Sequence, residues 1–361
     1  MASHAQPASG ATIYEVAARA GVSIATVSRT FADNGSVAPR TREAVLAAAQ
    51  ELRYVPAAAA RALAVRRSKA LGVVLPHIAG PYYSQLLVGF ELAASQLGLS
   101  VVLALASPTD HRAAAVRDLV GRVDGIAFMA RSGADDDTVR RVAATRPTVT
   151  VARRRLDEAD AFFAENRESA RHLTEHLLAH GHRRIGFVGR AESGSDIGRR
   201  HRGWLEALET AGLAPAMQLA VDPVEEAGIA VAEQLLADGD IHRFDALVCG
   251  NDELAIAIIA HLTAAGVRVP EDLAVTGWDD TRTARYLTPS LTTVRQDVTA
   301  LGGLAAHRLA ARIDGQGVQD PVTVASTLVP RASCGCPPVP PVPTRSTLAV
   351  PLPDPSPEES S

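Results

Sequence analysis

The chain has 361 residues, of which 47% are hydrophobic, and a formal net charge of −4. It is too long for one small domain and has room for a small module beside a large core. Its three cysteines do not make a disulfide framework in a chain of this length. The N-terminus lacks the basic and apolar regions of a signal peptide, and no apolar stretch approaches membrane-spanning length. We therefore expect a cytoplasmic protein without a membrane partner.

The charge is unevenly distributed along the chain. Through Ala70 the sequence contains nine Arg and Lys residues against four Asp and Glu, so this part carries +5 and the remainder −9. A basic head on an acidic body is the electrostatic pattern expected of a DNA-binding module attached to a larger sensor domain.

Residues 12–32, TIYEVAARAGVSIATVSRTFA, predict a helix-turn-helix unit. Apolar residues recur at helical spacing in its first half, and Gly21 suits a tight turn that needs positive φ. Ser23 is a candidate cap for a second helix. In such units the second helix lies in the DNA major groove. These signals alone are also compatible with an ordinary pair of small helices.

A third helix is predicted from Pro39, and Tyr54-Val55-Pro56 ends it. From Leu71 onward, short apolar runs alternate with helix-length segments, which predicts a parallel, doubly wound α/β architecture. The predicted strands are at 71–76, 100–106, 125–130, 148–152, 184–189, 246–250 and 273–278. The length accommodates two such sheets, with the chain crossing between them near 154–163, 289–296 and 326. Ligands of open α/β sheets bind at the carboxyl ends of the strands.

The motifs VAARAGVSIATVSR, TRE-AVLAAAQELRYVP and ARAL before LGVVLP resemble, in order and spacing, those of the LacI/GalR family of transcription regulators, which includes the lactose and purine repressors. The resemblance extends to about Arg331. It implies an all-α helix-turn-helix headpiece (1–55), a hinge helix and linker (56–69) and a two-lobed, periplasmic-binding-protein-like α/β core (70–335). Residues 336–361 are rich in Pro and Ser and are predicted to be a disordered tail.

By resemblance, the DNA-binding residues are Thr12, Ser23, Ile24, Ala25, Thr26, Ser28, Arg29, Arg61 and Leu63. Ile24, Ala25 and Arg29 face base edges in similar repressors, and a guanidinium can bond guanine bidentately. The short hydroxyl residues suit phosphate contacts, which position the protein without reading sequence. The alternative for Arg29 is a solvated or phosphate-paired side chain.

Residues 56–64 resemble the hinge helix of the family, although Ala57 stands where relatives often have Asn. Isolated helices shorter than about 12 residues rarely persist in water, so we expect this segment to order only on DNA and against its dimer mate. Leu63 matches the leucine that wedges into a minor-groove step and bends the operator. The alternative is a leucine packed against the core.

By resemblance, the effector-binding residues are Tyr82, Tyr83, Asp196, Arg200, Trp204, Asn251, Trp278 and Asp279. Spacing places Asp196, Arg200 and Trp204 on one helical face, and Asn251 and Asp279 follow strands. Carboxylate, guanidinium and amide groups suit a polyol, and the tryptophans offer faces for a sugar ring. The alternatives are helix caps for Asn251 and Asp279 and a surface charge run around Arg200.

One departure from the family pattern concerns the ligand. Relatives often have Asp in a VDRP-like stretch, whereas this chain has Ala152 in Val151-Ala152-Arg153-Arg154. A sugar-binding carboxylate is therefore missing. The alternatives are an altered orientation of the ligand or another ligand class, such as a purine or nucleoside, and Asp196 is a candidate to compensate in part.

The resemblance thus implies a homodimeric, ligand-responsive repressor of sugar uptake or catabolism genes that a sugar-like effector releases from a pseudo-palindromic operator. Corepression by the ligand remains an alternative. An enzyme is not expected, since no dinucleotide fingerprint, P-loop or nucleophile elbow is present. A secreted solute-binding protein shares the core fold but has a signal peptide in place of the headpiece.

Neither a cofactor nor a metal site is expected. Cys334-Gly335-Cys336 supplies two thiols, but with no His nearby in sequence the pair lacks the ligands that a metal needs. We interpret it as an exposed thiol pair without function.

Overall fold

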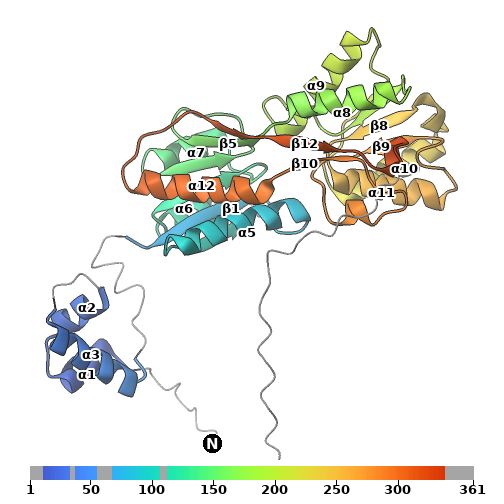
Figure 1. Ribbon diagram of the computed structural model, residues 1–361. Helices are drawn as coiled ribbons and strands as arrows, with labels where there is room; N and C mark the ends of the chain where they lie inside the picture. Colours follow the sequence, from blue (N-terminus) through green and yellow to red (C-terminus); the bar gives the residue numbers. More distant parts are fainter. Residues whose placement is uncertain (1–10, 33–36, 55–66, 106–111, 338–361) are drawn as a thin grey trace, which may run out of the picture. The chain divides into compact units, whose positions relative to one another are not determined.

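The computed structural model describes residues 11–32, 37–54, 67–105 and 112–337 (Figure 1). Beyond the helical headpiece, the core divides into an N-terminal lobe, which ends at Ala164 and resumes for Asp297–Ala325, and a C-terminal lobe of Glu165–Gln296 with the segment from Ser326. The chain therefore passes between the lobes three times. The first crossing lies just after the predicted segment 154–163, and the other two follow 289–296 and adjoin 326.

The headpiece is a three-helix unit, with helices α1 (Ile13–Ala20), α2 (Ile24–Ala32) and α3 (Pro39–Glu51). Thr12 and Glu15 form a reciprocal capping box at the start of α1. Gly21 has φ 65° and ends the helix in the left-handed conformation. The apolar faces of the three helices share one core that includes Val16, Val27, Val45, Ala48 and Ala49. The predicted helix-turn-helix layout is therefore present.

The N-terminal lobe contains a six-stranded parallel sheet in the order β11-β5-β4-β3-β1-β2. Its strands are β1 (Ala70–Leu75), β2 (Ser100–Leu105), β3 (Gly125–Met129), β4 (Thr148–Val151), β5 (Asp160–Ala164) and β11 (Val322–Val324). The apolar runs predicted at 71–76, 100–106, 125–130 and 148–152 are confirmed as β1 to β4. The edge strand β11 belongs to the segment that immediately precedes the third crossing of the chain.

Helices cover both faces of this sheet (Figure 1). They are α5 (Pro81–Gln96), α6 (Arg112–Val120), α7 (Asp136–Ala143) and α12 (Val298–Ile313). Leu71, Val73 and Leu75 of β1 pack with α5 and α12, whereas Val74 packs with α6 and α7. Because successive strand residues face opposite sides, a strand covered on both sides is apolar throughout, which is why β1 appears as a continuous apolar run.

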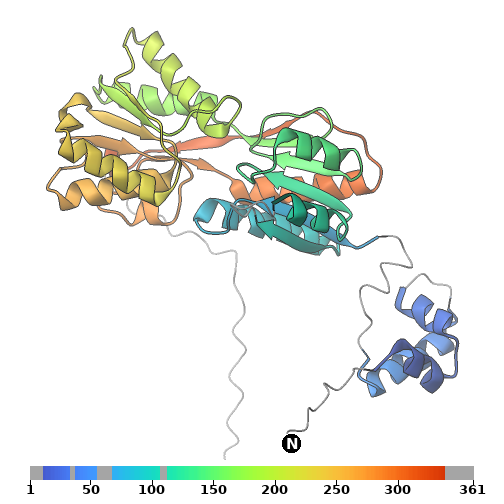
Figure 2. The same ribbon diagram turned by 180° about the vertical axis from the view of Figure 1, so that it is seen from behind.

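The C-terminal lobe repeats this plan with a four-stranded parallel sheet in the order β7-β6-β8-β9 (Figure 2). Its strands are β6 (Ile185–Val188), β7 (Gln218–Leu219), β8 (Ala246–Cys249) and β9 (Ala274–Thr276). Helices α8 (Arg167–Ala179) and α9 (Asp196–Thr210) cover one face, and α10 (Glu225–Ala237) and α11 (Asp252–Ala264) cover the other. Strands β10 (Thr293–Gln296) and β12 (Ser326–Val329) pair antiparallel beside it.

Short 3₁₀ helices complete the lobe: η1 (Asp240–Arg243), η2 (Thr283–Arg285) and η3 (Ala332–Cys334). Across the described segments of the chain, none of the helices is both long and apolar enough to span a bilayer.

Helices α5 and α12 approach each other at the backbone. A Cβ atom added at Gly302 would lie 2.1 Å from the carbonyl oxygen of Leu86, a separation that no real side chain adopts. At the adjacent Gly303 the nearest atom to such a Cβ, the carbonyl oxygen of Gly89, would be 3.6 Å away, which is an ordinary contact. Only one of the two glycines is therefore required by packing.

Gly302→Ala should destabilise the protein by about 1–3 kcal/mol, because the added methyl group forces the two helices apart. Gly303→Ala is the matched control. It should be neutral or stabilising by up to about 1 kcal/mol, since alanine favours a helix interior over glycine. Urea denaturation of the full chain measures both, and equal effects of the two substitutions would contradict the role given to the close approach.

Candidate DNA-binding surface and effector site

Helix α2 has one exposed face and one buried face. Ile24 is 41% exposed, and Ala25 and Arg29 are also exposed, whereas Val27 and Thr30 are buried in the headpiece. The residues predicted to meet base edges therefore share the exposed face. Because the opposite face of α2 packs in the headpiece core, the exposed face is available to DNA while the helix stays folded.

Two of the predicted DNA-binding hydroxyls, those of Ser23 and Thr12, have structural roles in the free headpiece. The Ser23 hydroxyl caps α2 by accepting from the backbone N–H of Thr26 at 3.2 Å. Thr12 caps α1, and its hydroxyl donates to Glu15 at 2.9 Å. Arg29 donates through Nε to the carbonyl of Ala25 at 3.1 Å, which leaves the two terminal nitrogens of the guanidinium for other partners.

Two of the predicted DNA-binding residues, Arg61 and Leu63, lie outside the described residues. Tyr14, which the sequence analysis did not single out, has an exposed side chain on α1, two residues after Thr12.

Arg200 is the best-anchored polar residue of the predicted effector set. Its side chain lies inside the C-terminal lobe, where Nε donates to the side-chain oxygen of Asn166 at 2.7 Å and Nη1 donates to the carbonyl of Gly250 at 2.5 Å. The guanidinium also lies over the ring of Trp278, 4.4 Å from its centroid. The alternative of a surface charge run is therefore wrong for Arg200.

The charge of this guanidinium affects the pKa of two of the predicted carboxyls, Asp279 and Asp196. Burial raises the pKa of Asp279 to about 7; the charge of Arg200 opposes the rise, and that of Asp252 adds to it. Burial also raises the pKa of Asp196, against the opposing charges of Arg200 and Arg199. Both groups thus combine burial with a nearby cation, as is common in binding sites.

The residues at the strand ends have mixed roles. Asn251 caps α11, accepting from the backbone N–H of Leu254 at 3.1 Å, so the cap interpretation holds for it. Asp279 has φ 117° and precedes no helix directly; its carboxylate accepts instead from the amide of Gln296. The neighbouring Asp280 is paired with Arg331 and Arg295 and is structural.

The two tryptophans differ from the expectation that their faces cover a ligand. Trp204 is only 1% exposed and packs in the core beside Phe187 and His201. Trp278 is fully buried, and Arg200 lies over its ring. The face of α9 that carries Arg200 and Trp204 is the face that packs on the sheet, so the shared face predicted from spacing is an interior one.

Asn166 was also missed by the sequence analysis. It is buried at the N-terminal end of α8, accepts from Arg200, and bonds to Asp196 as well. Only its position between a strand and a helix marked it in the sequence, a position that many capping residues share.

Tyr82 and Tyr83 lie at the start of α5 in the N-terminal lobe, with ring centroids 5.1 Å apart in an edge-to-face arrangement. The Tyr83 hydroxyl donates to the carbonyl of Ala130 at 2.9 Å. Ala152 is buried after β4 with φ 56°, a conformation that Asp and Asn tolerate better than alanine.

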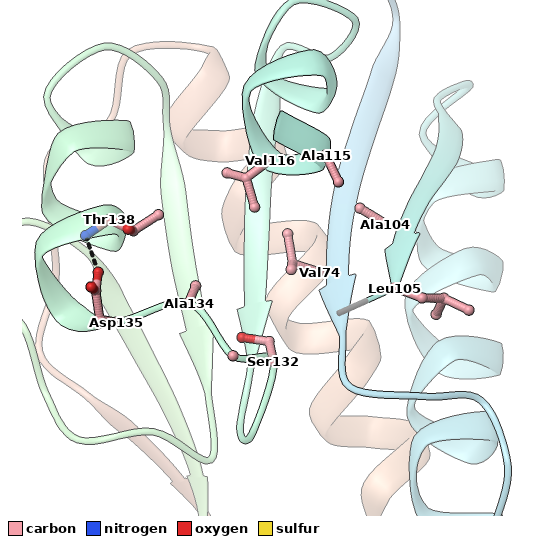
Figure 3. Close-up of a pocket in the computed structure, with 10 residues that line it drawn as sticks. Val74, Ala104, Leu105, Ala115, Val116, Ser132, Ala134, Asp135 and Thr138 are labelled. Atoms are coloured by element: carbon pink, nitrogen blue, oxygen red, sulfur yellow. Dashed lines mark hydrogen bonds between the residues drawn. The ribbon is translucent and has the colours of Figure 1, made fainter. Parts of the chain in front are cut away.

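Figure 3 shows a pocket in the same lobe, at the carboxyl ends of β1 and β2. Its lining is mainly apolar, with Val74, Ala104, Leu105 and Val116 beside Ser132 and Asp135. The Asp135 carboxylate accepts from the backbone N–H of Thr138 at 2.7 Å and caps α7. None of the predicted effector residues lines this pocket.

The sequence interpretation of the cysteine pair is wrong in two respects. Cys334 is buried in the C-terminal lobe rather than exposed. In addition, His176 and His180 of α8, far away in the sequence, lie beside the two thiols. The fold thus supplies the imidazoles that the local sequence lacks.

Comparison with known proteins identifies both parts of the chain. Residues 12–57 match the model of bacterial regulatory proteins of the lacI family, and residues 174–334 match the periplasmic binding protein-like domain. The chain is 34% identical over 332 residues to the HTH-type transcriptional repressor PurR of Erwinia tasmaniensis, covering 90% of this chain and 96% of that protein. It is 33% identical over 314 residues to PurR of Serratia proteamaculans, covering 84% and 90%.

The chain is also similar to solved structures of transcriptional regulators. The lac repressor dimer bound to operator and the anti-inducer ONPF has a TM-score of 0.78 and 29% identity, covering 90% of this chain and 99% of that chain. The complex of the regulator CelR with cellobiose has a TM-score of 0.68 and 30% identity, with the same coverage. Such regulators are cytoplasmic and are not enzymes, as expected from the sequence. The chain therefore belongs to the LacI family of bacterial transcriptional regulators and is a ligand-responsive, DNA-binding repressor.

Proposed function

We propose that this repressor binds a pseudo-palindromic operator as a homodimer and that a sugar or sugar derivative releases it, which permits expression of genes for sugar uptake or catabolism. The observation that carries the sugar assignment is the Arg200 guanidinium, fixed by Asn166 and Gly250 beside the partly buried carboxyls of Asp279 and Asp196. Carboxylates accept from hydroxyls and a guanidinium donates to them, so the group matches a ligand that is rich in hydroxyls.

The burial of the tryptophans favours a polyol over a purine. A flat aromatic base is bound best by stacking on an open aromatic face. Trp204 is within the core, and the ring of Trp278 has Arg200 over it, so neither offers such a face. The likeness to CelR, whose solved structure is a complex with cellobiose, supports the same ligand class.

In the mechanism that we propose, each headpiece of the dimer places the exposed face of α2 in the major groove of one half-site. The hinge residues Arg61 and Leu63 contact the DNA between the half-sites. The effector binds one arrangement of the lobes better than the other and so changes the hinge separation. A coupling of about 1–3 kcal/mol gives a 5–150-fold change in operator affinity.

Tryptophan fluorescence of the full chain tests the ligand assignment. Because Arg200 lies over Trp278, a ligand that engages the guanidinium should change the emission. We expect a saturable change with one member of a panel of monosaccharides, disaccharides and sugar phosphates. The same sugar should weaken binding to an operator selected from random DNA.

Asp279→Asn should reduce the affinity for that sugar about 10–150-fold, the loss expected for one charge-assisted hydrogen bond of roughly 1.5–3 kcal/mol. Asp238→Asn, at an exposed position in the same lobe, is the control and should leave affinity unchanged. Saturation by a purine or nucleoside instead of a sugar would contradict the assignment, and tighter operator binding with the sugar would indicate corepression.

Arg29→Ala should weaken operator binding by about 1–3 kcal/mol, mainly at one base pair, because a bidentate contact discriminates that base from the others. Arg19→Ala is the control. It removes an arginine of α1 that is paired at 2.7 Å with Glu51 of α3, and any loss of operator affinity that it causes should be equal for all operator variants. Band shifts with single-base operator variants measure both. A loss for Arg29→Ala that is uniform across the variants would mean that Arg29 contacts only phosphate.

The raised pKa of Asp279 predicts a pH dependence of stability. Between its ordinary value of 3.8 and about 7, the folded chain holds a proton that the unfolded chain has released. The contribution of this carboxyl to the free energy of unfolding is complete below pH 4 and declines as the pH rises to 7.

The free energy of unfolding of the wild type should therefore fall relative to that of Asp279→Asn between about pH 4 and pH 7, and the difference should then level off. Urea denaturation of both proteins across this range measures the difference. A constant difference for Asp279→Asn would show that its pKa is not raised.

A further inference from the structure

Four metal-ligating side chains meet at one point of the C-terminal lobe, at the opposite end of α8 from Asn166. They are His176 and His180 of α8 and Cys334 and Cys336 of the segment that follows β12, and their ligand atoms all lie within 4.8 Å of one another. We propose that these four residues form a structural zinc site that fastens the C-terminal segment of the core to α8.

The distances fit a single tetrahedral ion. His176 Nε2 lies 3.3 Å from Cys334 Sγ and 3.4 Å from Cys336 Sγ, and His180 Nε2 lies 3.3 Å from Cys336 Sγ. Zinc binds thiolate sulfur at about 2.3 Å and imidazole nitrogen at about 2.0–2.1 Å, so a tetrahedron places the two ligand types about 3.5 Å apart. These three separations are within a few tenths of an ångström of the tetrahedral value, and all four ligand atoms lie within 4.8 Å of one another.

The backbone places the ligands before any ion arrives. His176 and His180 are four residues apart on α8 and therefore project from one face, with ring centroids 4.7 Å apart. Gly335 has φ 95°, and this left-handed turn between the two cysteines brings both sulfurs to the same side.

Buried hydrogen bonds fix the position of Cys334. The Ser333 hydroxyl donates to the carbonyl of Val275 at 2.5 Å and accepts from the backbone N–H of Thr292 at 2.9 Å. The Thr292 hydroxyl lies 3.0 Å from Cys334 Sγ and 2.8 Å from the carbonyl oxygen of Arg331, so its one proton can be donated to the carbonyl or, when the sulfur is a thiolate, to Sγ. Such a bond to a ligand atom is typical of the surroundings of protein metal sites.

The composition of the site identifies the ion. Two thiolates and two imidazoles are a ligand set of structural zinc sites, and the two thiolate charges neutralise the 2+ charge of zinc where Cys334 is buried. With all four positions taken by the protein, no position remains for a substrate, so the expected role is structural.

The test uses the tag-free full chain, purified under reducing conditions without chelator, with metal measured by inductively coupled plasma mass spectrometry. We expect about one zinc ion per chain. Cys336→Ser and His180→Ala, which change a partly buried and an exposed ligand, should lower zinc affinity at least about tenfold. His172→Ala is the matched control: this residue lies one turn before His176 on α8, is exposed, and faces Glu168 rather than the cluster. It should retain the zinc.

Binding of Co²⁺ in place of zinc should give the strong visible absorption of a tetrahedral site and a thiolate charge-transfer band, and both should be lost in Cys336→Ser. A chelator should lower the thermal midpoint of the wild type and of His172→Ala but not that of Cys336→Ser. Operator binding and circular dichroism verify that each variant is folded.

Three results would overturn the proposal: reduced wild-type protein that contains no zinc and takes up none when Zn²⁺ is added, equal zinc content in Cys336→Ser and the wild type, or a Cys334–Cys336 disulfide in the protein as isolated from reducing buffer. Stoichiometric copper or nickel would overturn the assignment to zinc.

Discussion

The desolvation of one guanidinium determines how the C-terminal lobe is built. A buried charge is tolerated only where several groups replace the water that it has lost. Arg200 finds them on three separate elements: Asn166 before α8, the carbonyl of Gly250 after β8, and the ring of Trp278 after β9. These positions are thereby held at fixed separations, and Asn251 and Asp279 are the residues that immediately follow two of them. The polar group that we assign to the effector thus depends on the same contacts that make the arginine stable inside the lobe.

Much of this arrangement was predictable from the sequence, because local patterns determined it. Strands with helices on both faces are apolar at every position, so β1 and its neighbours were recognisable. Glycine and cap residues marked the turn of the headpiece. Helical spacing correctly placed Arg200 and Trp204 on one face but did not say what that face meets. The expectation of an open tryptophan face was wrong for this reason, since α9 turns that face toward the sheet.

Contacts between distant segments were beyond the sequence. His176 and Cys334 are 158 residues apart, and only the order of the strands brings them together. The spacing of His176 and His180 is also that of any two residues on one helical face. Asn166 was likewise invisible, because its partner Arg200 lies 34 residues away. Local periodicity in a single sequence does not reveal which residues that are far apart along the chain come into contact.

The origin of α12 and β11 has a consequence for synthesis on the ribosome. Helix α12 supplies Leu301, Ala305 and Leu309 to the core of the N-terminal lobe, and β11 supplies its edge strand, yet both are translated after most of the C-terminal lobe. Domains fold as units as the chain emerges. The headpiece, whose core cluster is made only of residues between Ile13 and Tyr54, can fold early, whereas the N-terminal lobe must wait with an incomplete core until residue 325 is available. A nascent repressor therefore has a folded headpiece long before it has a finished sensor.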